Sequence, residues 1–369
     1  MIYLDNGATS FHKPAAVYRA AADAMRRCAN PGRGGYGAAL AASRRIYACR
    51  EAAAELFHCL PEQVVLTSNC THGLNIAIHS LVTPGARVLI SGFEHNAVTR
   101  PLHALGADLR IAGRRLFDWE DTMDAFRREL DKGVDAAVFT HVSNVFGYVL
   151  PVAEMAGLCR ARGVPFIVDA AQSAGVLPLD LKALGADFIA MPGHKGLLGP
   201  QGTGLLLCNR DARPLLQGGT GSESFRQDMP PYLPDRLEAG TLNVPGFAGL
   251  TEGLRYIRKA GEESIFRREH GQLKRCAEEL KNMGMRVFSG DHQAGTISFL
   301  PGMDCEEAAA VLAQQGIAVR AGLHCAPLAH ESAGTLETGT VRISFGRDAG
   351  LGQTKALLQA VYKLKPFFE

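Results

Sequence analysis

One lysine, Lys195, lies in a stretch whose composition suits covalent chemistry. Apolar runs at 188–191 and 205–207 flank it and predict two buried strands. Glycines and prolines crowd the loop between them, which suits a backbone that turns sharply and lets a ligand approach. A lysine at a strand end, shielded from water, can have its pKa lowered enough to act as a nucleophile or form a Schiff base. The alternative is a surface hairpin that happens to carry a lysine.

Other polar residues follow predicted strands in the same way. His95 comes shortly after the predicted strand 87–90, Asn144 after 136–140, and Asp169 directly after 166–168. Each alone has an ordinary account, as a helix-start residue, a turn former or a cap. Parallel sheets, however, bind ligands just beyond the carboxyl ends of their strands. We therefore expect His95, Asn144, Asp169 and Lys195 to converge on one crevice.

A possible anion site precedes a predicted helix. The apolar run 64–66 is followed by the small polar residues of 67–73, and we expect a helix to begin near Leu74. Free backbone N–H groups and the helix dipole both favour a phosphate at such a point, close to Thr71. The alternative is a plain helix cap by Ser68 or Thr71.

Two residues in the C-terminal third offer further chemistry. Cys325 follows Arg320 in a loop beside His324, and a thiol near such groups can have a lowered pKa and attack as the thiolate. Arg342, in a Val-Arg-Ile-Ser run, could clamp a carboxylate with two hydrogen bonds. The alternatives are an inert buried cysteine and a strand-edge arginine in a surface ion pair.

Composition argues against several classes of function. The 369 residues carry 39 Lys plus Arg against 37 Asp plus Glu, so no charge excess points to nucleic acid or a membrane surface. Nine scattered cysteines without a CxxC pair predict neither a metal site nor a disulfide framework. The N-terminus lacks a basic and apolar leader and no apolar run is long enough to span a membrane, so we expect a cytoplasmic protein.

The order of the elements predicts an α/β fold. Helices are expected at 14–28 and 38–57, strands and helices then alternate, and a long helical segment at 248–283 leads to a strand at 295–300. We expect a large domain over residues 15–250 and a smaller α+β domain over residues 251–369, which residues 1–14 join.

The ordered motifs resemble those of the class V pyridoxal-phosphate (PLP) enzymes of fold type I, in the branch of cysteine desulfurases and selenocysteine lyases. The likeness covers nearly the whole chain and implies a large, mostly parallel seven-stranded sheet between helices. The segments that carry it are 3–6, 71–73, 94–95, 141–144, 169–172, 193–196, 238–241, 320–326 and 341–342.

The resemblance assigns a role to each candidate residue. Lys195 would carry PLP as a Schiff base and shuttle protons, Asp169 would pair with the pyridine nitrogen, and Thr241 would reach the phosphate of a partner subunit in a homodimer. The implied catalytic residues are Lys195, His95 and Cys325. The implied cofactor ligands are Lys195, Asp169, Gln172, His95, Cys70, Thr71, His194 and Thr241. The implied substrate ligands are Asn144, Arg342 and Arg320.

The reaction implied is the conversion of L-cysteine to L-alanine, with sulfur left as a persulfide on Cys325 and available to an acceptor protein. A selenocysteine or cysteine-sulfinate lyase, or another class V aminotransferase or epimerase, would use the same machinery. A third hypothesis is a non-catalytic scaffold that binds PLP and takes part in sulfur transfer. Two residues depart from the pattern of many relatives, because Leu323 replaces a second histidine and Pro192 replaces a hydroxyl residue near the phosphate.

Overall fold

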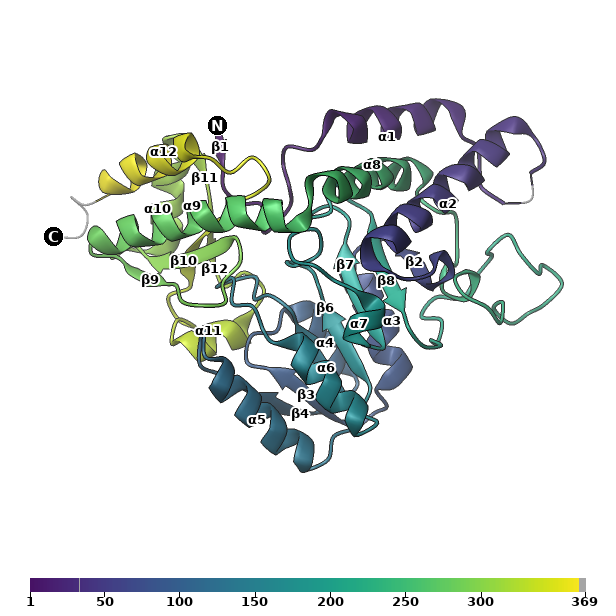
Figure 1. Cartoon of the computed structure of the whole chain (residues 1–369), viewed down its shortest axis with the longest axis horizontal. Helices are drawn as coiled ribbons and strands as arrows, with labels where there is room; N and C mark the ends of the chain where they lie inside the picture. The colour runs from purple at the N-terminus through teal and green to yellow at the C-terminus, as the bar shows by residue number, and fades with distance from the viewer. Residues whose placement is uncertain (33, 365–369) are drawn as a thin grey trace.

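The computed structural model describes residues 1–32 and 34–364, and it contains a large and a small sheet that lie beside each other (Figure 1). The strands of the large sheet are β2 (Val64–Thr67), β3 (Arg87–Ser91), β4 (Asp108–Ala112), β5 (Ala136–Thr140), β6 (Phe166–Asp169), β7 (Phe188–Pro192) and β8 (Gly204–Cys208). The helices around it are α1 (Ala15–Arg27), α2 (Gly37–Phe57), α3 (Cys70–Leu81), α4 (Asn96–Ala104), α5 (Trp119–Asp131), α6 (Val152–Ala161), α7 (Leu181–Leu184) and α8 (Val244–Ala260).

The large sheet is almost entirely parallel. Its strand order is β2-β8-β7-β6-β5-β3-β4, and only β8 runs against its two neighbours. The carboxyl ends of β2, β3, β5, β6 and β7 therefore meet at the same edge. The predicted mostly parallel seven-stranded sheet is confirmed.

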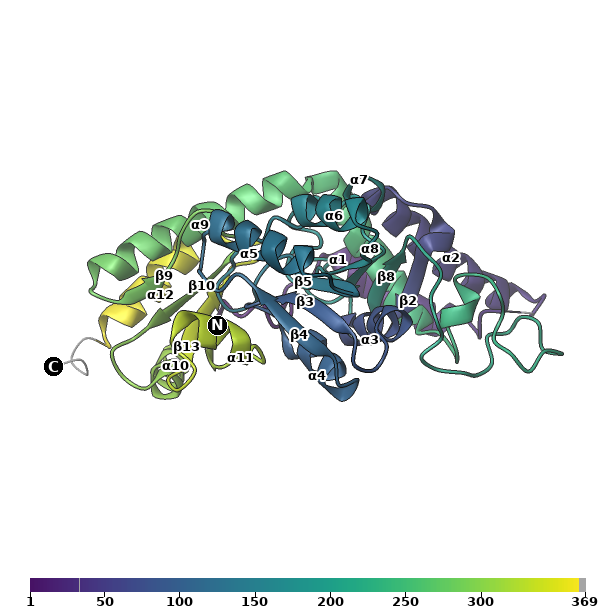
Figure 2. The same ribbon diagram turned by 90° about the horizontal axis from the view of Figure 1, so that it is seen from below.

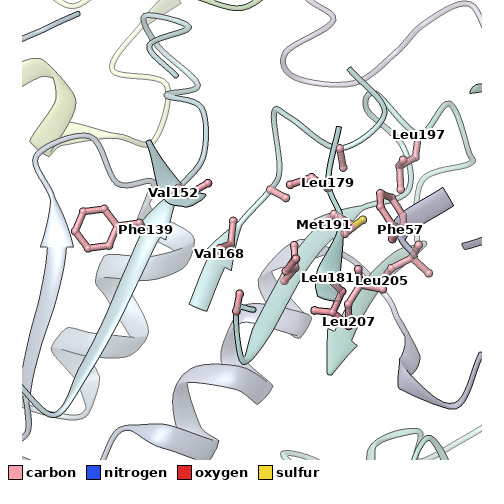
Figure 3. Close-up of a cluster of buried hydrophobic side chains, with 14 of the residues drawn as sticks. Phe57, Phe139, Val152, Val168, Leu179, Leu181, Met191, Leu197, Leu205 and Leu207 are labelled. Atoms are coloured by element: carbon pink, nitrogen blue, oxygen red, sulfur yellow. The ribbon is translucent and has the colours of Figure 1, made fainter. Parts of the chain in front are cut away.

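Successive residues of these strands enter two different cores. In β7, Ile189 and Met191 belong to one apolar cluster, whereas Phe188 and Ala190 belong to another. Because side chains alternate across a strand, both faces of the sheet are buried, and this explains the continuous apolar runs in the sequence. Figure 2 shows α5, α6 and α7 on one face and α3 and α4 on the other. Figure 3 shows the first cluster, in which Phe139, Val168, Met191, Leu205 and Leu207 project from neighbouring strands.

The small unit is built from the two ends of the chain. Its four-stranded sheet has the order β12-β13-β10-β9, and β1 pairs in parallel with β11 in a separate ladder. Leu4 enters the apolar core of this unit, so the N-terminal residues pack against the C-terminal part. Its elements are β1 (Ile2–Tyr3), α9 (Glu262–Asn282), β9 (Arg286–Phe288), β10 (Thr296–Leu300), α10 (Cys305–Gln314), β11 (Ile317–Ala318), β12 (Arg320–Gly322), α11 (Pro327–Ala333), β13 (Thr340–Ser344) and α12 (Leu351–Tyr362).

Three details differ from the sequence-based expectations. The segment 248–283 is not one helix, because Gly261 adopts a φ of 78° and separates α8 from α9. The helix after β2 begins at Cys70 rather than near Leu74, because Asn69 accepts a hydrogen bond from the His72 amide and caps it. The edge strand β4 was not predicted, because the strand predictions rest on continuous apolar runs, whereas β4 alternates polar and apolar residues. The proposed domain boundary at residue 250 lies inside α8 and stays a prediction.

Across the described ranges 1–32 and 34–364, no helix combines the length and apolarity needed to cross a membrane.

A buried ion pair ties α2 to the large sheet and to the segment before α8. Arg50 donates to both carboxylate oxygens of Glu238 and to the Val64 carbonyl, and Glu238 also accepts from the Leu66 amide. Both side chains are less than a tenth exposed.

We expect Glu238→Ala to lower the free energy of unfolding by about 3–5 kcal/mol, because Arg50 would stay buried without its partner. Chemical denaturation measures this. The matched control is Arg258→Ala, which removes an exposed ion pair with Glu55 and should change stability by less than about 1 kcal/mol. Equal effects of the two substitutions would contradict the role of the buried pair.

Candidate active site

A pocket lies where the parallel strands of the large sheet end. Eight of the residues predicted for the site line this pocket together. They are Cys70, Thr71, His95, Asn144, Asp169, Gln172, His194 and Lys195. The expected convergence of residues from separate strand ends is therefore observed.

Lys195 reaches the pocket from a tightly packed loop after β7. The Gly193 amide donates to the Thr203 carbonyl, and a Cβ at Gly193 would lie 2.1 Å from the Thr203 hydroxyl, so this turn requires glycine. The alternative for Lys195 was a surface hairpin. The strands β7 and β8 pair as antiparallel neighbours, but Lys195 lines the pocket and does not lie on the outer surface. Burial lowers the pKa of the Lys195 amine, which favours its neutral, nucleophilic form.

Asp169 and His95 face the same space. Asp169 is 2% exposed, and its Oδ1 accepts hydrogen bonds from the Ala171 amide and from the Cys70 thiol. His95 caps α4 by accepting from the Ala97 amide at Nδ1, so the proton of its neutral ring is on Nε2. Burial lowers the pKa of His95, and the nearby Asp169 carboxylate opposes that shift.

The N-terminal segment closes one side of the pocket. Gln172 donates to the Gly7 carbonyl at 2.9 Å, and the Nδ1 of His194 is 3.0 Å from the Thr9 hydroxyl. Burial and the charge of Lys195 lower the pKa of His194 to about 4, so its ring is neutral. His194 can therefore offer a hydrogen bond to a bound anion but no charge.

The start of α3 is where the sequence predicts an anion site, and the alternative of a plain cap by Ser68 or Thr71 is wrong. Asn69, and not Ser68 or Thr71, is the capping residue. The amides of Cys70 and Thr71 lie in the first turn, where helix geometry leaves N–H groups without an intrahelical acceptor. This end of α3 borders the same pocket as Lys195.

Arg342 is buried in the middle of the small sheet, and residues from two other segments of the chain hold its guanidinium. It donates to Asp5 at 2.8 Å and to the Asn144 carbonyl at 3.0 Å, while Arg320 donates to the same Asp5 carboxylate. The alternative of a strand-edge arginine in a surface pair is wrong, since β13 is central and Arg342 is 2% exposed. Sequence reasoning missed the role of Asp5, because its partners lie more than 300 residues away.

The loop that carries Cys325 rests against the rim of the pocket. The Asn96 amide donates to the Cys325 carbonyl at 2.7 Å, and the Asn144 side chain donates to the His324 carbonyl at 2.8 Å. His324 and Cys325 both have a positive φ, at 52° and 55°, and Cys325 is exposed. The inert buried cysteine is therefore excluded. Burial lowers the pKa of His324 to about 3, so it carries no charge that could stabilise a thiolate, contrary to our expectation.

Thr241 does not reach this pocket within one chain. It is exposed and lines a separate hollow together with Gly240, Arg50 and Glu238. Its predicted contact with a phosphate stays a prediction that requires a second subunit. Two residues depart from the pattern of many relatives. Pro192 lines the Lys195 pocket and offers no hydroxyl, and Leu323 is an exposed residue in the Cys325 loop.

The chain is similar in sequence to proteins named as probable cysteine desulfurases. A probable cysteine desulfurase of Methanothermobacter thermautotrophicus is 35% identical over 93% of this chain and 89% of its own length. A probable cysteine desulfurase of Pyrococcus abyssi is 31% identical over 99% of this chain and 94% of its own length.

Solved structures agree in fold. The apo structure of a cysteine desulfurase from Thermococcus onnurineus superposes with a TM-score of 0.91 and 32% identity, covering 98% of this chain and 94% of that one. A cysteine desulfurase from Escherichia coli gives a TM-score of 0.87 and 27% identity, covering 99% and 95%. The sequence model described as Aminotransferase class-V matches residues 2–357, and the chain therefore belongs to the class V aminotransferase family.

Proposed function

We propose that this protein is a PLP-dependent cysteine desulfurase that converts L-cysteine to L-alanine and leaves the sulfur atom on Cys325. The observation that carries the proposal is the pocket in which Lys195 and Asp169 lie together, with Arg342 and the Cys325 loop held at its rim. The relatives named cysteine desulfurase support the choice of substrate.

The pocket fits PLP at three points. Neither the Lys195 amine nor Asp169 Oδ2 makes a hydrogen bond with a described residue, and the first amides of α3 have no intrahelical acceptor. Lys195 would bind the aldehyde carbon, Asp169 the ring nitrogen, and the start of α3 with Thr71 and His194 the phosphate. When bound, PLP supplies an electron sink for carbanion chemistry at the substrate. His95 and Gln172 would contact the ring.

Arg342 is suited to hold the carboxylate of the amino-acid substrate. Its hydrogen bonds to Asp5 and to the Asn144 carbonyl use one N–H from each terminal nitrogen, and its buried Nε has no partner among the described residues. The buried Asn144 Oδ1 beside it is also unpaired in the described part of the chain. A guanidinium has five N–H donors in a fork that matches a carboxylate, so Arg342 can bind one while Asp5 orients it. Arg320 would act through the same Asp5.

Cys325 is the proposed acceptor of the sulfur atom. Its loop is tied to Asn96, the neighbour of His95, and to Asn144, and this supports a thiol close to the bound substrate. The sulfur of L-cysteine forms a bond to the Cys325 sulfur while its bond to carbon breaks. One cysteine and one protein thiol thus give one alanine and one persulfide, and no external oxidant or reductant is required.

The lyase alternatives would use the same pocket without requiring Cys325. A scaffold without activity would not require a free amine at Lys195 opposite a buried carboxylate. We also propose a cytoplasmic location, because all nine cysteines are free, and a sulfur-acceptor protein that would take the persulfide from the exposed Cys325.

We propose a homodimer in which Thr241 of each subunit contacts the phosphate in the other. The exposed Thr241 lies at the rim of a hollow away from its own Lys195 pocket, which supports a role toward another chain.

Sodium borohydride treatment of the PLP-loaded protein should fix the cofactor on Lys195, because that amine lines the pocket and has a lowered pKa. Peptide mass mapping identifies the modified residue. Lys195→Ala should abolish the adduct, whereas Lys13→Ala should keep it. Lys13 is a stringent control, since burial lowers its pKa to about 8 as well. An adduct on Lys13 would rule out the assignment.

Cys325→Ala should leave cofactor absorbance intact but reduce alanine formation from L-cysteine by at least about 100-fold, because no thiol remains to accept sulfur. Cys28→Ala, which removes a half-buried cysteine outside the pocket, should retain parental activity. If Cys325→Ala kept most of its activity, the desulfurase mechanism would be wrong. Loss of cysteine turnover with retained activity on selenocysteine or cysteine sulfinate would favour the lyase alternative.

The dimer proposal is tested by light scattering and by cofactor retention. The protein should have the mass of two chains, and Thr241→Ala should lose PLP faster on gel filtration than the parent. The control is Thr338→Ala. This threonine belongs to the small unit and lines neither the Lys195 pocket nor the hollow at Thr241. A fully active monomer would contradict the proposal.

A further inference from the structure

Cys70 lines the pocket, but the proposed mechanism uses only its backbone amide and gives its thiol no role. It is the first residue of α3, and its Sγ is 3.4 Å from Asp169 Oδ1. The same oxygen accepts the Ala171 amide at 2.9 Å. The side-chain hydrogen bonds of this carboxylate within the described ranges therefore all end on Oδ1, and none ends on Oδ2.

Close backbone packing places the thiol at this point. A Cβ at Gly204 would lie 2.7 Å from the carbonyl carbon of Asn69, so β8 presses directly against the residue that caps α3. One turn further, a Cβ at Gly73 would be 3.4 Å from the Ala190 side chain on β7. Because both strands approach α3 so closely, its first residue is held over the end of β6, where Asp169 lies.

The surroundings also keep Cys70 protonated. Burial and the neighbouring Asp169 raise the pKa of the Cys70 thiol well above its ordinary value. A protonated thiol donates a hydrogen bond and is a poor nucleophile, so Cys70 differs chemically from the exposed Cys325.

We propose that Cys70 is a positioning residue for Asp169. Its thiol and the Ala171 amide together hold Oδ1, and this leaves Oδ2 directed at the ring nitrogen of PLP. The inference rests on the proposed function, because it concerns the contact between Asp169 and the cofactor. Cys70 itself touches no reacting atom in this account.

The competing explanation is that Cys70 only fills space at the start of α3. The two explanations differ in what a substitution by a residue of similar volume does. Cys70→Val fills the space without a donor, whereas Cys70→Ser keeps a donor in a smaller side chain. Cys159→Ala is the matched control, since it removes another buried thiol, in α6, that does not line the pocket.

The test is the apparent dissociation constant of PLP, measured by titrating the apo protein and following cofactor absorbance. We expect Cys70→Val and Cys70→Ala to weaken binding about three- to tenfold, because each removes a hydrogen bond to a buried carboxylate from a weak donor. Cys70→Ser and Cys159→Ala should remain within about twofold of the parent. Parental affinity in Cys70→Val, or an equal loss in Cys70→Ser, would overturn the proposal.

A double-mutant cycle decides whether the effect passes through Asp169. In an Asp169→Ala background, Cys70→Val should change PLP affinity by less than about 1.5-fold, since the oxygen that the thiol holds is absent. The same loss in both backgrounds would assign Cys70 to packing alone. If the parent itself bound no PLP, the proposed function would fail, and this outcome is distinct from a failure of the role of Cys70.

Discussion

The direction of the strands in the large sheet is the constraint on which the site depends. Six strands run in the same direction, so their carboxyl ends meet at one edge, and residues that follow several of them share one pocket. His95, Asp169 and Lys195 come from separate strand ends, and they are far apart in the sequence. Reversal of a single strand would move its residue to the opposite edge. The two apolar cores that bury both faces keep these directions fixed.

A second constraint is the buried carboxylate of Asp5, which joins the two ends of the chain. It pairs with Arg320 on β12 and Arg342 on β13, and the Asp5 backbone bridges to Ser344. Arg342 in turn donates to the Asn144 carbonyl in the large unit. The N-terminal segment thus orients the arginine proposed to bind substrate, and the small unit that holds this arginine also carries the Cys325 loop.

Much of the fold could be predicted from the sequence, because the strands of the parallel sheet are apolar on both faces and small polar residues follow them. His95, Asn144, Asp169 and Lys195 were predicted because each follows a strand, whereas Cys70, Gln172 and His194 were implied only by the family resemblance. What could not be predicted depends on contacts between distant segments. Asp5 has no local signal for its two arginines, and β4 shows only the weak alternation of an edge strand. The neutral state of His324 follows from burial, which the sequence of the loop does not reveal.

The proposed reaction moves one sulfur atom from the substrate to the protein. Its most direct test is a single turnover with one equivalent of sulfur-labelled L-cysteine and no reductant, followed by peptide mapping without thiol reagents. The account predicts one labelled sulfur atom per chain on the peptide that contains Cys325, together with one equivalent of alanine. Label on another cysteine, or free sulfide released without a labelled Cys325, would contradict it.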